Sequence, residues 1–311
     1  MQQLKERRGR SRTDDDYGEG EACFEVSEEL LLDEKALSQR IVEVFRAPGY
    51  VPPQLPSVGT QLIRLSQSPD ADIKSIVRLL QSDPMLAGEC LKQVQSVFYS
   101  RGREVTNLET AVVRLGLKTL HGIVMSVCMN MRVFRTAAYA PHMERIRRHS
   151  QAVARLSELF RRKTSVHGDD AVTAGLLHDV GMAGILLVLG DVPRGQPVPD
   201  LMLLWPAIHR AHAEAGSIMT RLWDLPQEIA RVTYFHHQVT VEGRHHPLSS
   251  IVTLADDLAS ELGMDAVEDG LTDRTPSSTL QSARDFLGLD DRDCGKVRDE
   301  AEDLLARGAL A

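Results

Sequence analysis

The sequence predicts an all-α protein, and three observations support that prediction. Apolar residues recur at three- and four-residue spacing through most of the chain, which is the period of a helix with one buried face. Helix-start signatures are frequent: Asp83 precedes Pro84, and the run Thr106-Asn-Leu-Glu109 matches a capping box. The alternating pattern of half-buried strands is nearly absent. We therefore expect a bundle of packed helices.

The first half of the chain is predicted to form one helical lobe. A helix begins near Ser27 and ends at Pro48-Gly49, because proline and glycine both disfavour a helix interior. Residues 50–56 contain three prolines, so we expect an extended connector there. Further helices are expected over 73–80, from 83 onward, over 106–115 and over 117–127, the last two separated by Gly116. Residues 28–136 thus make an N-terminal lobe without a cluster of reactive side chains.

A second group of helices is expected over residues 137–265. The segment 170–189 is almost continuously apolar, which predicts a central buried helix. The other helices are expected from about 141 to 162, from His212 to about 226, from 229 to 237 and from 249 to 257. The more polar residues 266–311 form a C-terminal helical extension that ends in a helix near 297–305.

Composition places the chain among globular proteins. Its 311 residues can form one large domain or two smaller ones, and 42% hydrophobic with 26% charged residues is ordinary for a soluble protein. The formal net charge of -8 argues against a duplex nucleic-acid binder, which neutralises phosphates with a basic face. The four cysteines form no C-x-x-C pair, so a zinc ribbon or disulfide framework is not indicated and a cytoplasmic protein is expected.

The N-terminal segment is strongly charged, and no membrane-spanning run is expected in the sequence. Residues 1–27 carry a basic block and then an acidic block, with no apolar core of a secretory signal. Such a segment cannot bury enough apolar surface to fold alone, so we predict a flexible charged tail, with an interaction arm as the alternative. No run approaches the roughly 18 apolar residues of a membrane span.

Seven residues of metal-ligand type occur in order along the second group of helices. Neutral imidazole and carboxylate together suit Fe, Mn or Zn. Small and apolar residues flank the central His-Asp pair, where an unneutralised carboxylate would be costly. The sequence therefore predicts a site for a divalent transition metal. Its candidate ligands are His149, His178, Asp179, His212, His236, His237 and Asp256.

Structural roles are the alternative for histidines. A single histidine on a helix is commonly a hydrogen-bonded core or surface residue, and we interpret four of them so: His121, His142, His167 and His209. The pair His245-His246 lies between Gly243 and Pro247, which indicates a loop outside the site. The seven-residue set itself could be a relic that binds metal without catalysis.

Three stretches of the chain carry a family pattern. They are Leu55-Pro-Ser-Val with Ser82-Asp-Pro-Met-Leu-Ala87, Val105-Thr-Asn-Leu-Glu-Thr-Ala-Val-Val-Arg-Leu-Gly116, and Arg148-His-Ser150 with Leu176-Leu-His-Asp-Val-Gly181. Trp223-Asp-Leu-Pro226 and His236-His237 extend the pattern to about residues 50–260. These stretches resemble the HDOD family, the bacterial HD-related output domains. The resemblance implies an N-terminal helical bundle lobe packed on an HD-like helical lobe, and a non-catalytic output or scaffold role in signalling.

A more distant likeness concerns the HD-GYP phosphodiesterases, which hydrolyse cyclic di-GMP at a metal centre. It implies that the seven candidate residues are metal ligands. Catalytic HD domains commonly carry a lysine after the glycine that follows the His-Asp pair, whereas this chain has Met182, and the GYP signature is absent. A cation aimed at developing charge lowers a barrier considerably, and methionine supplies none.

The sequence therefore predicts no catalytic residue and a module that docks a signalling protein. Two alternatives stay open: a metal-dependent phosphodiesterase acting on a cyclic dinucleotide, and a nucleotide sensor without turnover. The resemblance identifies neither the partner nor the ligand.

Overall fold

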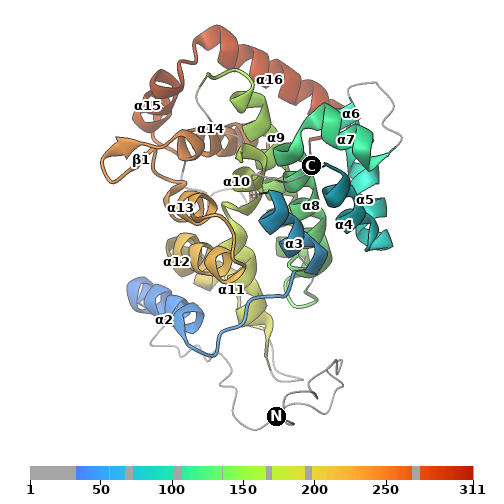
Figure 1. Ribbon diagram of the computed structural model, residues 1–311. Coiled ribbons are helices and arrows are strands. Elements are labelled where there is room, and N and C mark those ends of the chain that lie inside the picture. The colour runs from blue at the N-terminus through green and yellow to red at the C-terminus, as the bar shows by residue number, and fades with distance from the viewer. Residues whose placement is uncertain are drawn as a thin grey trace, which may run out of the picture.

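The computed structural model describes residues 33–55, 57–66, 73–100, 107–134, 136–165, 170–192, 198–267 and 274–310. Helices dominate these residues (Figure 1). The strands among them are β1 (Thr240–Val241) and β2 (Arg244–His245), which pair antiparallel as a short hairpin. The predicted all-α class is confirmed. The predicted tail over 1–27 lies outside the described residues.

One lobe consists of the helices from α3 to α8, with α8 packed against α3, α5 and α7. Asp83 caps α5 as predicted, because its carboxylate accepts from the Leu86 amide at 3.0 Å. Gly116 separates the last two helices with a φ of 79°, in the left-handed region that favours glycine. The helices are α3 (Ser57–Ser66), α4 (Ile73–Gln81), α5 (Pro84–Val94), α6 (Val97–Ser100), α7 (Leu108–Leu115) and α8 (Leu117–Arg132).

The start of α7 differs in detail from the expected capping box. Asn107 supplies the side-chain cap, since its Oδ1 accepts from the Thr110 amide at 2.8 Å. Thr106, the expected cap, lies outside the described residues.

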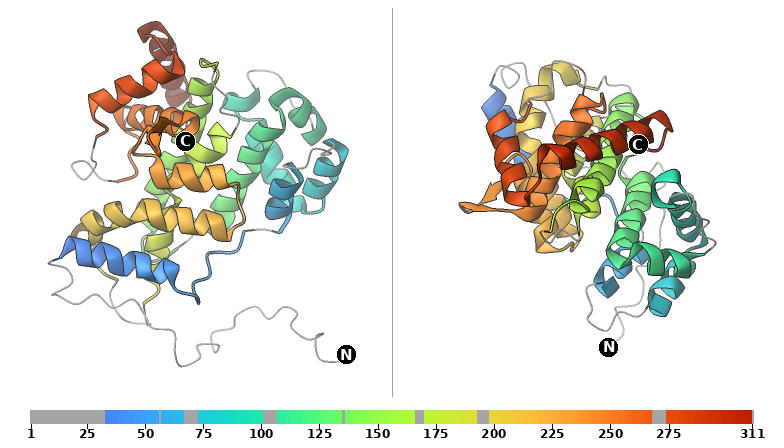
Figure 2. Two further views of the ribbon diagram at one scale, coloured as in Figure 1. Left: turned by 60° about the vertical axis from the view of Figure 1, so that its left-hand side comes forward. Right: turned by 90° about the horizontal axis from the view of Figure 1, so that it is seen from above.

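The other lobe is built on the 22-residue helix α9, against which α10 and α14 pack. Figure 2 shows this lobe beside the smaller one, and α8 joins them by packing on α10. Its helices are α9 (Ala140–Arg161), α10 (Ala171–Leu177), α11 (Val180–Gly190), α12 (Leu201–Leu222), α13 (Gln227–Phe235) and α14 (Pro247–Glu261). The chain continues into α15 (Ser277–Leu287) and α16 (Asp291–Ala306), which pack on α14 and α9 respectively.

The first described helix, α2 (Glu34–Arg46), is not part of the N-terminal lobe that the sequence predicted for it. It ends before Pro48-Gly49 as expected, but it packs on α12 of the second lobe. Ion pairs from Arg46 to Glu214 and from Arg210 to Glu34 support that contact. The expected lobe over 28–136 is therefore wrong for α2, because sequence proximity does not decide which apolar surface a helix covers.

Two predicted helix bounds are also corrected. The central segment 170–189 is two helices, α10 and α11, with a turn at His178 and Asp179. The helix expected to begin at His212 instead begins at Leu201, capped by Asp200, whose carboxylate accepts from the Met202 amide at 2.9 Å. Pro206 lies inside its early turns, which obscured the apolar period in the sequence.

The expectation that no run approaches a membrane span is wrong by length and composition, because one described stretch passes that test. It is Ala171–Gly190, and 89% of its apolar window is buried inside the protein, as in a core helix.

Candidate metal centre

Four buried histidines are oriented in the same way. In each ring, Nδ1 lies 2.5–2.8 Å from a backbone carbonyl oxygen, to which it donates its proton. A ring protonated at Nδ1 presents a lone pair at Nε2, which is the arrangement of a metal-ligating imidazole. The pairs are His149 with Met264, His178 with Gly175, His212 with His209, and His236 with Thr233.

The free Nε2 atoms converge in two groups. In the first, the Nε2 atoms of His149 and His178 lie 3.2 Å apart. In the second, His212 Nε2 lies 3.2 Å from His236 Nε2 and 3.1 Å from His237 Nε2. Lone pairs that face one another at these distances repel, so each group calls for a cation or a proton between its nitrogens.

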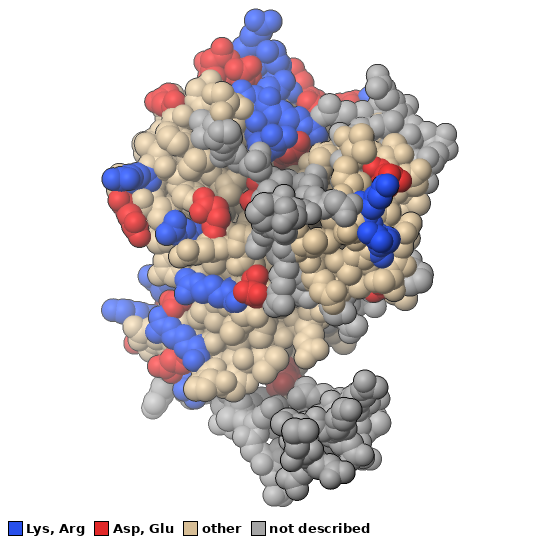
Figure 3. All heavy atoms as spheres, in the orientation of Figure 1, with Lys and Arg blue, Asp and Glu red and all other residues tan. Residues whose placement is uncertain are grey.

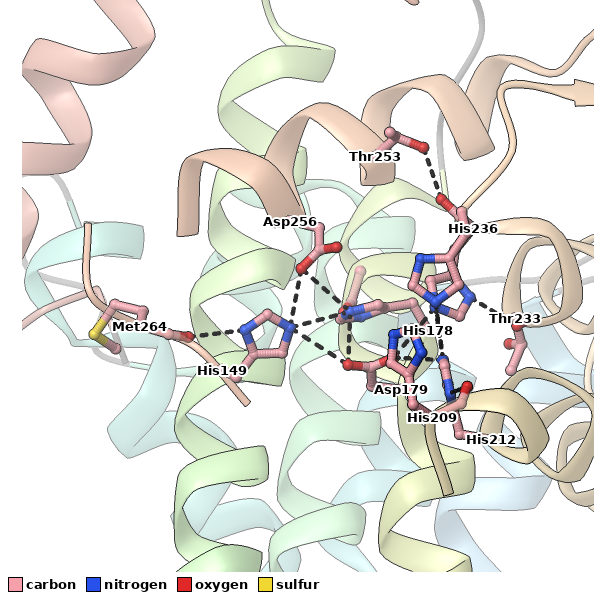
Figure 4. A network of polar contacts seen from close by, with 12 residues as sticks. His149, His178, Asp179, His209, His212, Thr233, His236, Thr253, Asp256 and Met264 are labelled. Atoms are coloured by element: carbon pink, nitrogen blue, oxygen red, sulfur yellow. Dashed lines mark hydrogen bonds and ion pairs between the residues drawn. The ribbon is translucent and has the colours of Figure 1, made fainter. Parts of the chain in front are cut away.

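Asp179 stands between the two groups (Figure 4). Its Oδ2 lies 3.5 Å from His149 Nε2 and 3.3 Å from His178 Nε2. Its Oδ1 lies 3.4 Å from His212 Nε2 and 3.2 Å from His236 Nε2, yet this buried oxygen has no hydrogen-bond partner among the described residues. A buried carboxylate oxygen without a donor is expensive, and a metal ion would neutralise it.

Asp256 completes the first group, with its Oδ1 3.2 Å from His149 Nε2 and 3.9 Å from His178 Nε2. In each group, three side-chain ligand atoms lie within 4.8 Å of one another. One group is His149, His178 and Asp256, and the other is His212, His236 and His237. With one Asp179 oxygen facing each group, the donor set fits two metal ions, and Asp179 would offer one ligand atom to each.

Close helix packing brings these residues together. A Cβ on Gly175 would lie 2.8 Å from the Val153 oxygen, so glycine lets α10 approach α9 and places His178 beside His149. A Cβ on Gly181 would lie 1.9 Å from the His212 oxygen, so α11 and α12 touch backbone to backbone. The turn between α10 and α11 lets the adjacent His178 and Asp179 face one centre. In a continuous helix their side chains would point about 100° apart around the helix axis.

Helix α14 fixes the position of the residues that directly follow α13. Thr253 Oγ1 donates to the carbonyl of His236 at 2.7 Å and to that of Ser249 at 2.8 Å. The backbone that carries His236 and His237 is thereby fixed to the helix that carries Asp256. These contacts hold the backbone beside the ligands in place, and hydrogen bonds of this kind orient the ligands of metal centres.

Without a metal, the cluster has strongly shifted pKa values. Burial acts to lower the pKa of His178, but the charges of Asp179 and Asp256 outweigh it and raise that pKa to about 9. Burial lowers the pKa of His212 to about 3, although Asp179 opposes this. Electrostatic repulsion from the neighbouring His236 ring, together with burial, lowers the pKa of His237 to about 2. A proton on His178 thus takes the place of one cation beside Asp179, whose own pKa stays well below its ordinary value against the effect of burial.

The centre reaches the surface at two residues. His149, His178, His212 and His236 are at most 2% exposed, whereas the Asp256 side chain is 23% exposed and His237 is an exposed residue. A ligand from solvent therefore meets the Asp256 and His237 sides first.

The structure brings all seven sequence-predicted ligand residues together, while their binding of metal stays a prediction. Among the other histidines, His245 stacks on Phe286 with ring centroids 4.8 Å apart, and His246 pairs with Glu228 at 2.8 Å and caps α14. Both lie outside the cluster, as expected. His167 lies outside the described residues.

Sequence reasoning missed the position of His209. Its ring centroid lies 5.4 Å from that of His212 and 5.5 Å from that of His237, beside the second group. The three-residue spacing between His209 and His212, on one face of α12, is the signal that could have placed it. Met182, by contrast, is 4% exposed in α11 and brings no charge to the centre.

Comparisons with known proteins agree with this architecture. A model of the HDOD domain matches residues 53–239. A curated relative, an uncharacterized protein of Treponema pallidum (strain Nichols), is 28% identical over 216 residues, which are 65% of this chain and 41% of that protein. The chain therefore spans less than half the length of this relative.

Solved structures show the same fold. An HDOD domain protein of unknown function from Geobacter sulfurreducens is 21% identical with a TM-score of 0.67, over 89% of this chain and 98% of that one. A candidate metal-dependent phosphohydrolase from Shewanella amazonensis SB2B is 19% identical with a TM-score of 0.65, over 86% and 99%. A candidate signal transduction protein from Marinobacter aquaeolei VT8 is 18% identical with a TM-score of 0.59, over 90% and 64%. At these identities the likeness shows the fold.

Proposed function

Because this chain belongs to the HDOD domain family, we propose that it is a signal-transduction output module whose second lobe holds two divalent transition-metal ions. One observation carries the metal proposal: four imidazoles locked at Nδ1 aim their Nε2 lone pairs at Asp179, whose buried Oδ1 has no hydrogen-bond donor among the described residues. Imidazole nitrogens whose lone pairs face one another repel, and a buried carboxylate oxygen without a donor is costly. Both arrangements require a positive charge beside them.

Each ion has its own ligand set in this proposal. His149, His178, Asp256 and Asp179 Oδ2 would hold one, and His212, His236, His237 and Asp179 Oδ1 would hold the other. Nitrogen-rich sites with carboxylate favour Fe, Mn or Zn over Mg or Ca. Bound there, the ions would supply Lewis acidity toward the oxygens of a phosphoester.

The output in this proposal is docking of a signalling protein, with hydrolysis absent or slow. Met182 is a buried neutral side chain at the position where catalytic HD domains carry a lysine, so a phosphoester would lack that cation. The N-terminal lobe offers exposed apolar side chains for docking, with Met85 67% and Val113 72% exposed. A ligand at the metal centre would regulate docking only if its affinity differs between two conformations.

A second candidate is a metal-dependent phosphodiesterase acting on a cyclic dinucleotide such as cyclic di-GMP. The observation that favours it is the access from solvent at Asp256 and His237, beside an otherwise buried ligand set. Binding of the same ligand without turnover would make the protein a nucleotide sensor.

Metal analysis tests the first step. Protein purified without chelator should carry about two transition-metal ions per chain, one for each donor group, and His178→Ala should lose them. His245→Ala removes a histidine outside the cluster and should keep them. Metal-free wild-type protein under metal-replete conditions would contradict the proposal.

Turnover separates the two candidate functions. The metal-loaded protein should hydrolyse cyclic di-GMP well below about 1 per second, the slow end of typical enzymes. Met182→Lys should raise the rate, whereas Met182→Leu should not, because only lysine adds charge. A wild-type rate above that value, abolished by His178→Ala, would establish the phosphodiesterase instead.

Docking is tested by measuring how one captured partner binds to the full chain and to matched variants of it. A signalling protein captured by the full chain should still bind after deletion of residues 1–27. Binding should be lost with Met85→Glu and with Val113→Glu. It should be retained with Leu203→Glu, an apolar position on α12 that is 61% exposed. A partner released by Leu203→Glu and not by the other two would overturn the assignment to the N-terminal lobe.

A further inference from the structure

The segment after α14 follows α9 from one end to the other. We call this segment the C-terminal strap; it comprises residues 264–267 and 274–310, with α15 and α16. Five side chains on or just after α9 bind it. They are His149 to the Met264 oxygen at 2.8 Å, Arg145 to the Val267 oxygen at 3.3 Å, Thr164 to the Leu287 oxygen at 2.8 Å, Arg162 to Glu300 at 3.8 Å, and Arg155 to the Ala309 oxygen at 2.7 Å.

Two of these arginines, Arg155 and Arg162, also contact the N-terminal lobe. Phe98 of α6 is 3% exposed, and its ring centroid lies 5.7 Å from Arg155 Cζ and 5.6 Å from Arg162 Cζ. A guanidinium at this distance is attracted to the ring, more strongly when water is excluded. Each arginine that contacts Phe98 is thus held in turn by the strap.

The end of the strap is buried at this junction. Ala309 is 9% exposed and Leu310 is fully buried. Figure 3 shows Lys and Arg side chains gathered at the end of the molecule where α9 and α16 lie in Figure 1. Several cations held close together repel one another, so the Ala309 carbonyl and the carboxylates of Glu158 and Glu300 are needed to keep Arg155 and Arg162 in place.

We infer that the C-terminal strap is an intramolecular clasp that fixes the N-terminal lobe against α9 through the Arg155–Phe98–Arg162 cluster. The strap lies after residue 239, where the match to the HDOD domain ends. Releasing it uncovers Phe98 and Tyr99, which are at most 5% exposed in the closed arrangement. The contacts to Phe98 are made by Arg155 and Arg162, which are not metal-site residues, whereas His149 of the metal centre binds the strap at Met264.

Hydrogen–deuterium exchange on the full chain tests the clasp. The double variant Arg155→Ala, Arg162→Ala should accelerate amide exchange about tenfold in peptides covering 95–100 and 304–310, the size expected from losing two partly buried cation–π contacts. Peptides from α12, which has no part in the clasp, should keep the wild-type rate. Arg307→Ala removes an exposed arginine just after α16, whose partner is Asp303 on that helix, and should change the exchange of neither peptide.

A second variant guards against general unfolding. Phe98→Leu keeps an apolar side chain but removes the ring, and should accelerate exchange in 304–310 less than the double arginine variant while enlarging the radius of gyration in small-angle scattering. Unchanged exchange in both peptides of the arginine variant, or equal acceleration in α12, would overturn the clasp.

Discussion

The two lobes bury different kinds of side chain. Among the described residues of α3 to α8, the buried polar side chains are His121 and Ser126. Residues 137–265 bury many more: His149, Ser150, Gln151, Ser157, Glu158, Thr173, His178, Asp179, His212, Ser217, Thr220, Thr233, His236, His246, Ser249, Ser250 and Thr253. The comparison teaches that the N-terminal lobe is built for packing, whereas the second lobe gives up apolar burial to hold a charged centre.

That difference changes what stabilises each lobe. The N-terminal lobe depends on apolar contacts and helix caps such as Asp83. The second lobe must also keep Asp179 neutralised, which a proton on His178 does in the metal-free protein and which the proposed metal ions would do when bound. Four tests can break or sharpen this contrast.

The largest effect is expected from matched glycine substitutions. Gly181→Ala places a methyl against the His212 backbone and should lower the free energy of unfolding by about 3 kcal/mol or more, because two helices must separate. Gly88→Ala, on an open helix position of α5, should raise it by about 0.5–1 kcal/mol. Urea unfolding measures both. Equal effects at the two positions would contradict a tightly constrained metal lobe.

Metal removal should destabilise one lobe selectively. At a free metal concentration about a hundredfold above Kd, binding stabilises the native state by about 2.7 kcal/mol. Chelation should therefore speed amide exchange in α12 and α13 while α5 and α8 keep their rates. Asp179→Asn removes the negative charge that faces both groups of ligands and should abolish this metal dependence. Exchange that changes to the same extent in both lobes would show that the centre stabilises the whole molecule.

The metal-free protein should be most stable near pH 6.5. His178 has a folded pKa of about 9, above its ordinary value of 6.5, so its stabilising contribution is complete below pH 6.5 and is lost as the pH rises through 9. His212 and His237 have folded pKa values of about 3 and about 2, so both gain protons on unfolding and stability falls as the pH drops below 6.5.

Urea midpoints at pH 5, 6.5 and 9 measure that dependence. Saturating metal should flatten the alkaline side, because the ion replaces the proton on His178. A metal-free protein whose midpoint rises steadily from pH 5 to pH 9 would show that His178 is not protonated beside Asp179.

The smallest effect belongs to the N-terminal lobe. Asp83→Ala removes the cap of α5 and should cost about 1 kcal/mol, without altering metal content. Asp83→Asn keeps an oxygen acceptor, so it should lose only part of that free energy of unfolding. Metal loss in Asp83→Ala would mean that the lobes are more tightly coupled than their separate cores indicate.

Sequence alone determined the helical class, the Asp83 cap of α5 and the set of candidate ligands. Helical periodicity and the Asp83-Pro84 pair are local signals, so they survive any tertiary arrangement. The ligand types were recognisable because His178 and Asp179 interrupt an apolar segment, where a charge requires a partner.

Only the tertiary structure decided how those ligands divide into two groups. The division into two groups around Asp179, the place of His209 and the packing of α2 on α12 all depend on contacts between distant segments. The turn between α10 and α11 is the clearest case: periodicity predicts one helix, yet joint attraction of His178 and Asp179 to a single centre requires the break. Local propensity fixes which residues are helical, but long-range packing fixes where their side chains meet.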